Sequence, residues 1–596
     1  MFPTCFLSGM LFPMFGEKLH SVIGVSTQSS GALTLANTFG AAIGSGLATF
    51  LLLPMLGIEL SMLAISFCYL LIALLSFLSS TVGSRAKFAL QAIGVASVLI
   101  IAIFPYGGIN RSYQIFAQQT LPNEQLVSST ESVYATLHYY RKEVLGQAES
   151  YRLVTNGYSM SGSNFAGERY MKMFAYLPYI LKDGIDDALL ISYGVGNTAQ
   201  GLTQIDSLKS LDIVDVSQDI IDLSIPAHRE IGYGPLEDER TVVHIEDGRF
   251  FLQSTEKMYD LITGEPPPPK APHIANLYSQ EFFELTKEHL SPGGMISYWL
   301  PVHDLHASDS ASIIKAFCNV YEDCSLWNGF DLDFIMIGTR GGLPALSMDA
   351  ILRHWSNEGI QSELVRIALE KPAQLGNLFM ADASRLTELT ANIQPLTDNY
   401  PQRISPSTRG MRDRAELYSY LLNIEGRRAH FASSRYINEL FPEEFITEAV
   451  NNFELQKLFM IGTNNPHIDY PLPYFWDALA FLLRSTQLQT LPLLLLSGNP
   501  RELEILAGSD ANDTFEYKQS LIKKLVIDRN YQQSIKEIED ILVEHFDDVD
   551  IDYYRKLDTV LKGVVGGVEI ERALNSPSFE IYDEEFRNWF VASFSN

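Results

Sequence analysis

Hydrophobic and polar positions divide the 596-residue chain into regions of different character. The first 110 residues hold only five charged side chains, and three uncharged apolar stretches cross them, at about 31–57, 60–81 and 88–105. Each stretch approaches the roughly 20 residues that a helix needs to span a bilayer. We therefore predict a transmembrane helical region over 1–110, with a buried soluble core as the alternative reading. Residues 1–15 are apolar and lack the basic leader and cleavage site of a signal peptide, so we expect them to end a membrane segment whose beginning is missing.

The pattern changes to that of a soluble α/β protein after the apolar region. Alternating residues within 128–160 predict short strands and a small β-domain. A helical pattern at 169–181 is followed by short apolar runs separated by helical stretches; these runs lie at 188–193, 211–215, 241–245, 259–262 and 294–298. Alternating strands and helices predict a mostly parallel sheet. Residues 411–596 read as a polar, α-helical C-terminal extension.

Net charge and cysteine spacing limit the classes of ligand that we expect the protein to bind. The net charge of −28, without a basic stripe, argues against a nucleic-acid partner, whereas an acidic surface attracts cationic small molecules. Cys318 and Cys324 lack the second Cys or His pair that a zinc site needs, so we predict unpaired thiols and no metal site.

One group of residues has the arrangement of a nucleoside site. Gly194 and Gly196 follow an apolar strand and open a helix, where backbone amides can approach a ligand closely. Asp215 ends the next strand and can accept hydrogen bonds from ribose hydroxyls, while Asp247, followed by Gly248, ends the third strand and can contact an adenine. The alternative is that the glycines make a tight turn and the aspartates cap helices.

At this point the chain resembles the spermidine synthase family. The resemblance rests on six motifs in order: Leu190-Ile191-Ser192-Tyr193-Gly194-Val195-Gly196, Asp212-Ile213-Val214-Asp215, Glu246-Asp247-Gly248-Arg249, Tyr259-Asp260-Leu261-Ile262, Leu277-Tyr278-Ser279-Gln280-Glu281-Phe282-Phe283 and Leu290-Ser291-Pro292-Gly293-Gly294. It covers 128–340, with a small β part at 128–160 and a Rossmann-like part at 165–340. A weaker tail occupies 341–410. The preceding apolar segments resemble the membrane-fused branch of this family.

The resemblance implies an S-adenosylmethionine-methyltransferase-like Rossmann fold. It also implies an activity, the transfer of an aminopropyl group from decarboxylated S-adenosylmethionine to an amine. On this basis the nucleoside ligands are Gly194, Gly196, Asp215, Asp247 and Gly248. Glu265 takes the place of the family's catalytic Asp and is the predicted proton acceptor. The alternative is that Glu265 caps a turn beside a stiff proline segment.

The sequence departs from the family where the amine should bind. Val195 replaces the acidic residue of the glycine loop, Met160, Met171 and Lys172 fall where polar ligands are expected, and Pro268 replaces a second Asp. We therefore expect a free diamine to bind poorly. His303, Asp304 and His306, after the following strand, are further candidates for the wall of the same cleft.

Two other activities compete with aminopropyl transfer. One is methyl transfer from intact S-adenosylmethionine, and the other is nucleoside binding without turnover by a regulatory domain. We expect a multi-pass protein of the bacterial inner membrane, in contact with the bilayer. Lys18, Arg85 and Lys87 would place the soluble part outside, but the cytosolic origin of the cosubstrate favours the cytoplasm. The sequence leaves a homo-oligomer open.

Overall fold

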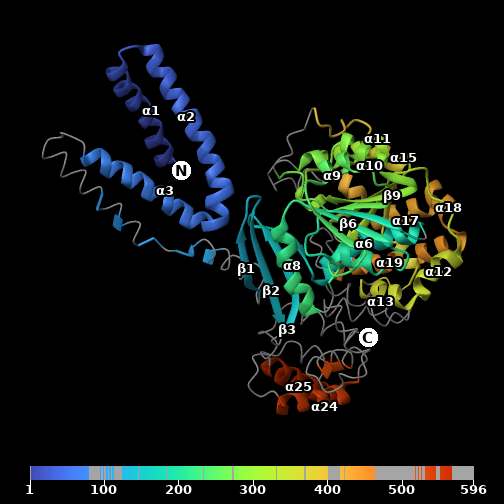
Figure 1. The fold of residues 1–596 in the computed structure, drawn as a ribbon. Coiled ribbons are helices and arrows are strands. Elements are labelled where there is room, and N and C mark those ends of the chain that lie inside the picture. Colours follow the sequence, from blue (N-terminus) through green and yellow to red (C-terminus); the bar gives the residue numbers. More distant parts are fainter. Residues whose placement is uncertain are drawn as a thin grey trace. The chain divides into compact units, whose positions relative to one another are not determined.

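The computed structural model describes residues 2–78, 124–144, 147–182, 184–231, 234–271, 274–330, 332–367, 371–399, 417–421, 423–462, 530–544 and 551–566, with scattered positions in 94–112, 369 and 517–525. The chain divides into two compact units, 1–138 with 155–158 and 139–154 with 159–596. Figure 1 shows the elements of both units.

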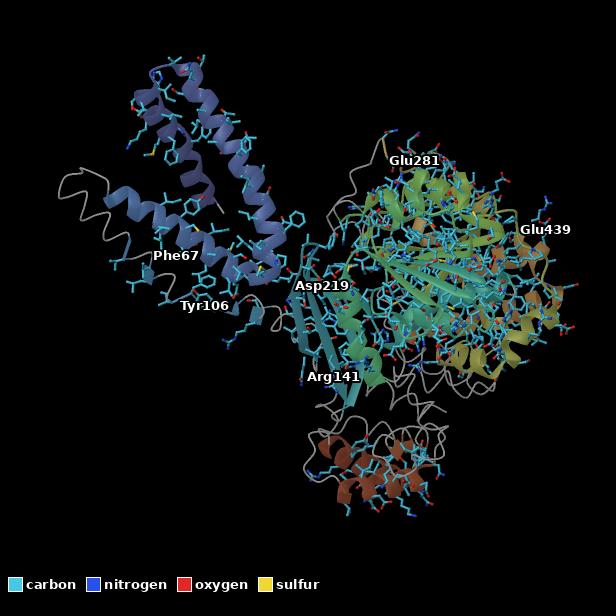
Figure 2. The ribbon with its side chains drawn as sticks, in the orientation of Figure 1. Phe67, Tyr106, Arg141, Asp219, Glu281 and Glu439 are labelled. Atoms are coloured by element: carbon cyan, nitrogen blue, oxygen red, sulfur yellow. A yellow bond between two sulfur atoms is a disulfide. The ribbon has the colours of Figure 1, made fainter. Side chains whose placement is uncertain are left out.

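The first unit begins with long apolar helices. They are α1 (Phe2–Ile23), α2 (Ser26–Leu47), a π-helical segment (Ala48–Leu52) and α3 (Leu53–Leu78). The helical stretch Ser26–Ile72 is long and apolar enough to cross a membrane, although a signal sequence passes the same test. Its apolar side chains face outward, and Figure 2 shows Phe67, which is 64% exposed, projecting from α3.

A kink at Gly57 interrupts this stretch. The φ of Gly57 is +71°, a value that favours glycine, and the next amide, of Ile58, donates to the Glu131 carboxylate. The predicted stretches 31–57 and 60–81 thus meet at a glycine bend. The third, 88–105, lies almost entirely outside the described residues and stays a prediction.

Four strands lie within 124–162, where the sequence predicts short strands over 128–160. The strands β1 (Glu124–Glu131), β2 (Thr136–Val144), β3 (Gln147–Thr155) and β4 (Tyr158–Gly162) form a four-stranded sheet in the order β1-β2-β3-β4.

The second unit contains an eight-stranded sheet with the order β12-β10-β11-β9-β8-β5-β6-β7. Its strands are β5 (Asp187–Ile191), β6 (Ser210–Asp215), β7 (Thr241–Ile245), β8 (Tyr259–Gly264), β9 (Leu290–Pro301), β10 (Ser325–Phe330), β11 (Asp333–Thr339) and β12 (Phe379–Asp382). The neighbouring strands β7, β6, β5, β8 and β9 run parallel to one another. The strand β11 runs antiparallel to both β9 and β10. This order is that of a Rossmann-like, methyltransferase-type fold, with β12 added at one edge.

Helices cover both faces of this sheet (Figure 1). They are α6 (Phe165–Lys182), α7 (Asn197–Thr203), α8 (Gln218–Ile231), α9 (Gly248–Ser254), α10 (Gln280–Glu288) and α11 (Ala307–Val320). The side chains of α9, α10 and α11 form one apolar core with the strands, whereas α6 packs on β8, β9, β10 and β11. Short 3-10 turns occur at Ala275–Leu277 and Val302–Asp304.

The segments after β11 pack around the same core. They comprise α12 (Met348–Ser356), α13 (Glu358–Arg366), α14 (Ala373–Gly376), α15 (Ala383–Leu389), α16 (Leu417–Leu421), α17 (Ile424–Ser433), α18 (Arg435–Leu440) and α19 (Glu443–Gly462). The buried guanidinium of Arg427 on α17 donates to the carbonyl oxygens of Asn377, at 2.7 Å, and Phe379, at 3.0 Å. The first part of the predicted helical extension therefore packs on the preceding tail. Further on, α24 (Tyr531–Glu544) and α25 (Ile551–Val565) pack on each other.

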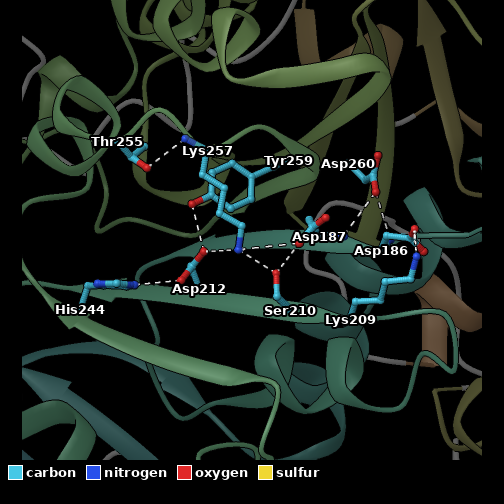
Figure 3. Close-up of polar contacts among 10 residues, drawn as sticks. All are labelled: Asp186, Asp187, Lys209, Ser210, Asp212, His244, Thr255, Lys257, Tyr259 and Asp260. Carbon is cyan, nitrogen blue, oxygen red and sulfur yellow. Dashed lines mark hydrogen bonds and ion pairs between the residues drawn. The ribbon is translucent and has the colours of Figure 1, made fainter.

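A polar network lies at the amino ends of the parallel strands (Figure 3). Asp212 accepts hydrogen bonds from Lys257 at 2.8 Å and Tyr259 at 3.0 Å, and it contacts His244 at 2.9 Å. Burial alone would raise the pKa of Asp212, but these contacts hold it below its usual value. Asp260 binds the backbone amides of residues 186 and 187. Asp212 and Asp260, which belong to two of the six sequence motifs, thus make hydrogen bonds within the fold.

The structure contradicts one prediction about the cysteines. Cys318, on α11, and Cys324, before β10, form a disulfide with their Cα atoms 5.3 Å apart. The prediction of unpaired thiols was wrong, because the chain reverses between α11 and β10 and brings the two side chains together.

Candidate active site

The glycine loop after β5 has a backbone that other residues would strain. Gly194 and Gly196 have φ values of +60° and +86°. A Cβ on Gly194 would lie 2.9 Å from the Ser161 hydroxyl, and one on Gly196 would lie 2.5 Å from the Tyr193 hydroxyl. Ser192 also has a positive φ, of +72°, so backbone strain concentrates in this loop. The turn therefore needs glycine at both predicted positions.

Asp215 lies beneath this loop, at the end of β6. Its carboxylate is buried and accepts one hydrogen bond per oxygen, from the amides of Tyr193 and Ser217, both at 2.9 Å. Burial raises the pKa of Asp215, and the two amides oppose that rise. Each oxygen keeps a second lone pair. The carboxylate thus shapes the loop and retains acceptors, and its contact with a ribose stays a prediction.

Asp247 caps a helix, which is the alternative to nucleoside binding that the sequence left open for this residue. It is exposed, and its Oδ1 accepts a hydrogen bond from the Phe250 amide at 2.9 Å as the N-cap of α9. Gly248 permits close packing, because a Cβ there would lie 2.6 Å from the Ile191 side chain. Adjacent Arg249 binds Asp398 of the tail through both carboxylate oxygens. The contact of Asp247 with an adenine stays a prediction.

Glu265 follows β8 and lies against the glycine-loop strand and α7. Its amide donates to the Ile191 carbonyl at 3.1 Å, and its Oε1 contacts the Thr198 hydroxyl. The same hydroxyl lies 2.9 Å from the Met171 carbonyl oxygen. The Thr198 hydroxyl, on the first turn of α7, can therefore donate its one hydrogen to the Glu265 carboxylate or to the Met171 carbonyl.

The surroundings of Glu265 also change the acidity of its carboxyl group. Burial raises its pKa to about 8; the Thr198 hydrogen bond opposes the rise, and nearby Asp333 adds to it. The second oxygen, Oε2, is buried and has no hydrogen-bond partner in the described part of the chain. A carboxyl that gains and loses a proton near neutral pH is suited to acid–base chemistry.

Aromatic side chains lie near Glu265. Tyr170 of α6 and Trp299 of β9 lie nearly parallel, with ring centroids 6.3 Å apart and an interplanar angle of 21°. Burial raises the pKa of Tyr170 strongly, and the charges of Glu265 and Asp333 raise it further. Two carboxyl groups close to aromatic rings form an environment that favours a cation.

Lys172, one of the departures from the family pattern, belongs to a buried network of ion pairs. Its buried ammonium contacts Glu363 at 2.7 Å, and the Tyr176 hydroxyl donates to the same oxygen at 3.0 Å. One turn earlier, Glu168 pairs with Arg366 at 2.9 Å. These buried ion pairs join α6 to α13, so the basic residue is part of the core.

The other departures also have structural roles. Val195 is 2% exposed, and the Met171 sulfur accepts a hydrogen bond from Asn197 at 3.3 Å. Met160, on β4, is partly exposed. Pro268 is buried, and the Tyr278 hydroxyl fixes the proline segment by donating to the Pro266 carbonyl at 3.1 Å.

His303 and Asp304 lie in the 3-10 turn after β9, and His306 is the N-cap residue of α11; their place in the wall of a cleft stays a prediction. His303 Nδ1 is 3.5 Å from Asp333 Oδ1, and Asp304 forms an ion pair with Lys270. Sequence reasoning missed Asp333. The residue starts an antiparallel strand, and the pattern of acidic residues that follow parallel strands does not include it. Within the described ranges, no cluster of three or more His, Cys, Asp or Glu side chains could hold a metal.

The strand order defines a Rossmann-like, methyltransferase-type α/β fold, and sequence comparison narrows this class. Residues 167–326 match the family described as "Spermine/spermidine synthase domain". The chain is 26% identical over 295 residues to a polyamine aminopropyltransferase of Oceanobacillus iheyensis, a match that covers 49% of this chain and 56% of that protein. It is 23% identical over 198 residues to the spermine synthase SPE4 of Saccharomyces cerevisiae, covering 31% and 64%.

The matched part of the chain is therefore similar to spermine and spermidine synthases, and it spans about half the length of the curated relatives. Among solved structures, a spermidine synthase from Thermotoga maritima aligns with a TM-score of 0.32 and 18% identity, over 36% of this chain and 73% of that one. A probable spermidine synthase from Corynebacterium glutamicum gives 0.34 and 15%, over 47% and 98%. The fold assignment rests on the strand order.

Proposed function

We propose that the protein binds decarboxylated S-adenosylmethionine and transfers its aminopropyl group to an amine, with Glu265 as the proton acceptor. The observation that carries this proposal is the Glu265 carboxyl that follows β8, which contacts Thr198 and lies near Tyr170. The match of residues 167–326 to the synthase family supports it. The membrane anchor and the nucleoside ligands Gly194, Gly196, Asp215, Asp247 and Gly248 belong to the same proposal.

The proposed reaction is a displacement at carbon. The acceptor nitrogen attacks the aminopropyl carbon bonded to the sulfonium, the carbon–sulfur bond breaks, and its electron pair goes to sulfur, leaving methylthioadenosine. The nitrogen loses a proton, which the Glu265 carboxylate accepts. Because the donor is cationic, its binding lowers the pKa of Glu265 and ionises the base when it is needed.

Methyl transfer from intact S-adenosylmethionine is the second candidate, and Val195 is the observation that favours it. An apolar residue in the glycine loop removes a carboxylate that could distinguish the decarboxylated side chain from the intact one. Glu265 and Asp333 favour the decarboxylated cosubstrate, because their negative charges repel the carboxylate of the intact one. This repulsion makes the decarboxylated form our first choice.

Product analysis by mass spectrometry tests the proposal. The full-length protein in detergent would receive either cosubstrate and a panel of amines, and we expect aminopropylated amine together with methylthioadenosine. Glu265→Gln should lower the transfer rate by roughly 100-fold or more, while methylthioadenosine affinity stays nearly unchanged. Glu322→Gln, at an exposed position, is the charge-matched control. Methylated product would favour the second candidate, and transfer that survives Glu265→Gln would exclude the assigned base.

A further inference from the structure

Asp333 lies at the edge of the sheet that carries the candidate site, although it is outside the matched residues 167–326. It is the first residue of β11, and its register partner is Pro301, the last residue of β9. Because β11 is antiparallel to β9, the start of one strand meets the end of the other. Glu265 follows Gly264, whose partner on β9 is Tyr298. Both acidic residues therefore lie near the carboxyl end of β9.

The contacts of Asp333 hold its carboxylate beside the aromatic pair. The Trp299 indole donates to Oδ1 at 2.9 Å, and His303 Nδ1 is 3.5 Å from the same oxygen. The other oxygen, Oδ2, accepts no hydrogen bond from the described residues. The indole thus orients the carboxylate and leaves one oxygen for a ligand.

Asp333 forms no ion pair with Lys or Arg among the described residues. Lys270 pairs with Asp304, and Lys172 pairs with Glu363. Burial raises the pKa of Asp333 to about 7, and its charge adds to the raised pKa of Glu265. Two carboxyls kept partly neutral by burial would gain favourable interactions from a bound cation, since an opposite charge stabilises their ionised forms.

We propose that Asp333 binds a protonated amino group of the acceptor, beside the pair formed by Tyr170 and Trp299, and so determines which amines are accepted. This inference rests on the proposed function. A diamine would place one ammonium at Asp333 and its other, neutral nitrogen near Glu265. Asp333 therefore supplies a cation ligand in place of the acidic residues that Val195 and Pro268 replace. With this ligand we expect a diamine to bind weakly.

The test compares 1,4-diaminobutane with 1-aminobutane, an acceptor of the same length without the second ammonium. Asp333→Asn should raise the KM for the diamine by roughly 30-fold or more, because it removes one partner of a buried charge pair. The KM for the monoamine and both kcat values should change little. Asparagine keeps the acceptor oxygen for Trp299, so the fold should persist, and Asp333→Glu should restore part of the preference.

Controls separate the failure of this inference from the failure of the proposed function. Asp349→Asn removes the same charge from an exposed position of α12 and should leave both KM values unchanged. Calorimetry would also measure methylthioadenosine binding, and then amine binding to the complex. A wild-type chain that binds neither would refute the proposed function and this inference with it. If the wild-type chain binds both and Asp333→Asn keeps the diamine preference, the inference about Asp333 alone is wrong.

Discussion

Replacing Glu265 with Gln should stabilise the domain, increasingly so as the pH rises. The pKa of Glu265 in the folded protein is raised from its ordinary value of 4.5 to about 8, chiefly by burial. The folded state then holds this proton across the window from about 4.5 to 8, whereas the unfolded chain releases it. The stability that this proton contributes is present below pH 4.5 and is lost as the pH rises through 8. Glutamine does not titrate, and its side-chain oxygen can still accept the hydrogen bond from Thr198.

The magnitude follows from the width of that window. A difference of about 3.5 pKa units corresponds to roughly 4 to 5 kcal/mol at full ionisation, at 1.36 kcal/mol per unit. Glu265 is partly exposed, so solvent screening reduces this value, and we expect about 2 kcal/mol or more. The free energy of unfolding of Glu265→Gln should therefore exceed that of the wild type by about 2 kcal/mol more at pH 9 than at pH 5.

Urea unfolding of the full-length protein in detergent, at pH 5, 7 and 9, would measure this difference. Tryptophan fluorescence is a suitable signal, because Trp299 and Trp327 are buried in the domain. The net charge of −28 lowers stability at high pH in both variants, so only the difference between them reports on Glu265. Glu322→Gln, at an exposed position, provides the matched control. A gap that stays constant, or that narrows as the pH rises, would refute the raised pKa of Glu265 in the folded protein.

Two further predictions concern the nucleoside and the membrane. Asp215→Ala and Asp247→Ala should each weaken methylthioadenosine binding by roughly 1 to 3 kcal/mol, since a ligand hydroxyl or amine loses its acceptor; unchanged calorimetric affinity in both variants would contradict the site. Asp247→Ala also removes a helix cap, so its thermal unfolding should be measured beside its affinity. Residues 31–105 should anchor the protein, so extraction should require detergent; recovery of the full-length chain in the soluble fraction after alkaline washing would exclude membrane spanning.

Local features of the sequence were sufficient to predict much of the fold. Short apolar runs followed by turns and helices predicted β5 to β9, because a buried parallel strand needs apolar side chains on both faces. Gly194 and Gly196 were identifiable because their positive φ values exclude most other residues. Asp215, Asp247 and Glu265 were candidates because the ends of successive parallel strands meet at one edge of a sheet. Each of these inferences depends on neighbours in the chain.

Only the tertiary structure decided which distant side chains meet. Asp333 lies near Glu265 because the antiparallel strand β11 begins where β9 ends. Its hydrogen-bond partner Trp299 lies on β9. Lys172 could be read as a lost amine ligand until the structure paired it with Glu363, almost two hundred residues later. The pairing of Cys318 with Cys324 likewise depends on a chain reversal. Sequence patterns describe the periodic burial of one element at a time, whereas ion pairs and disulfides depend on how separate elements pack together.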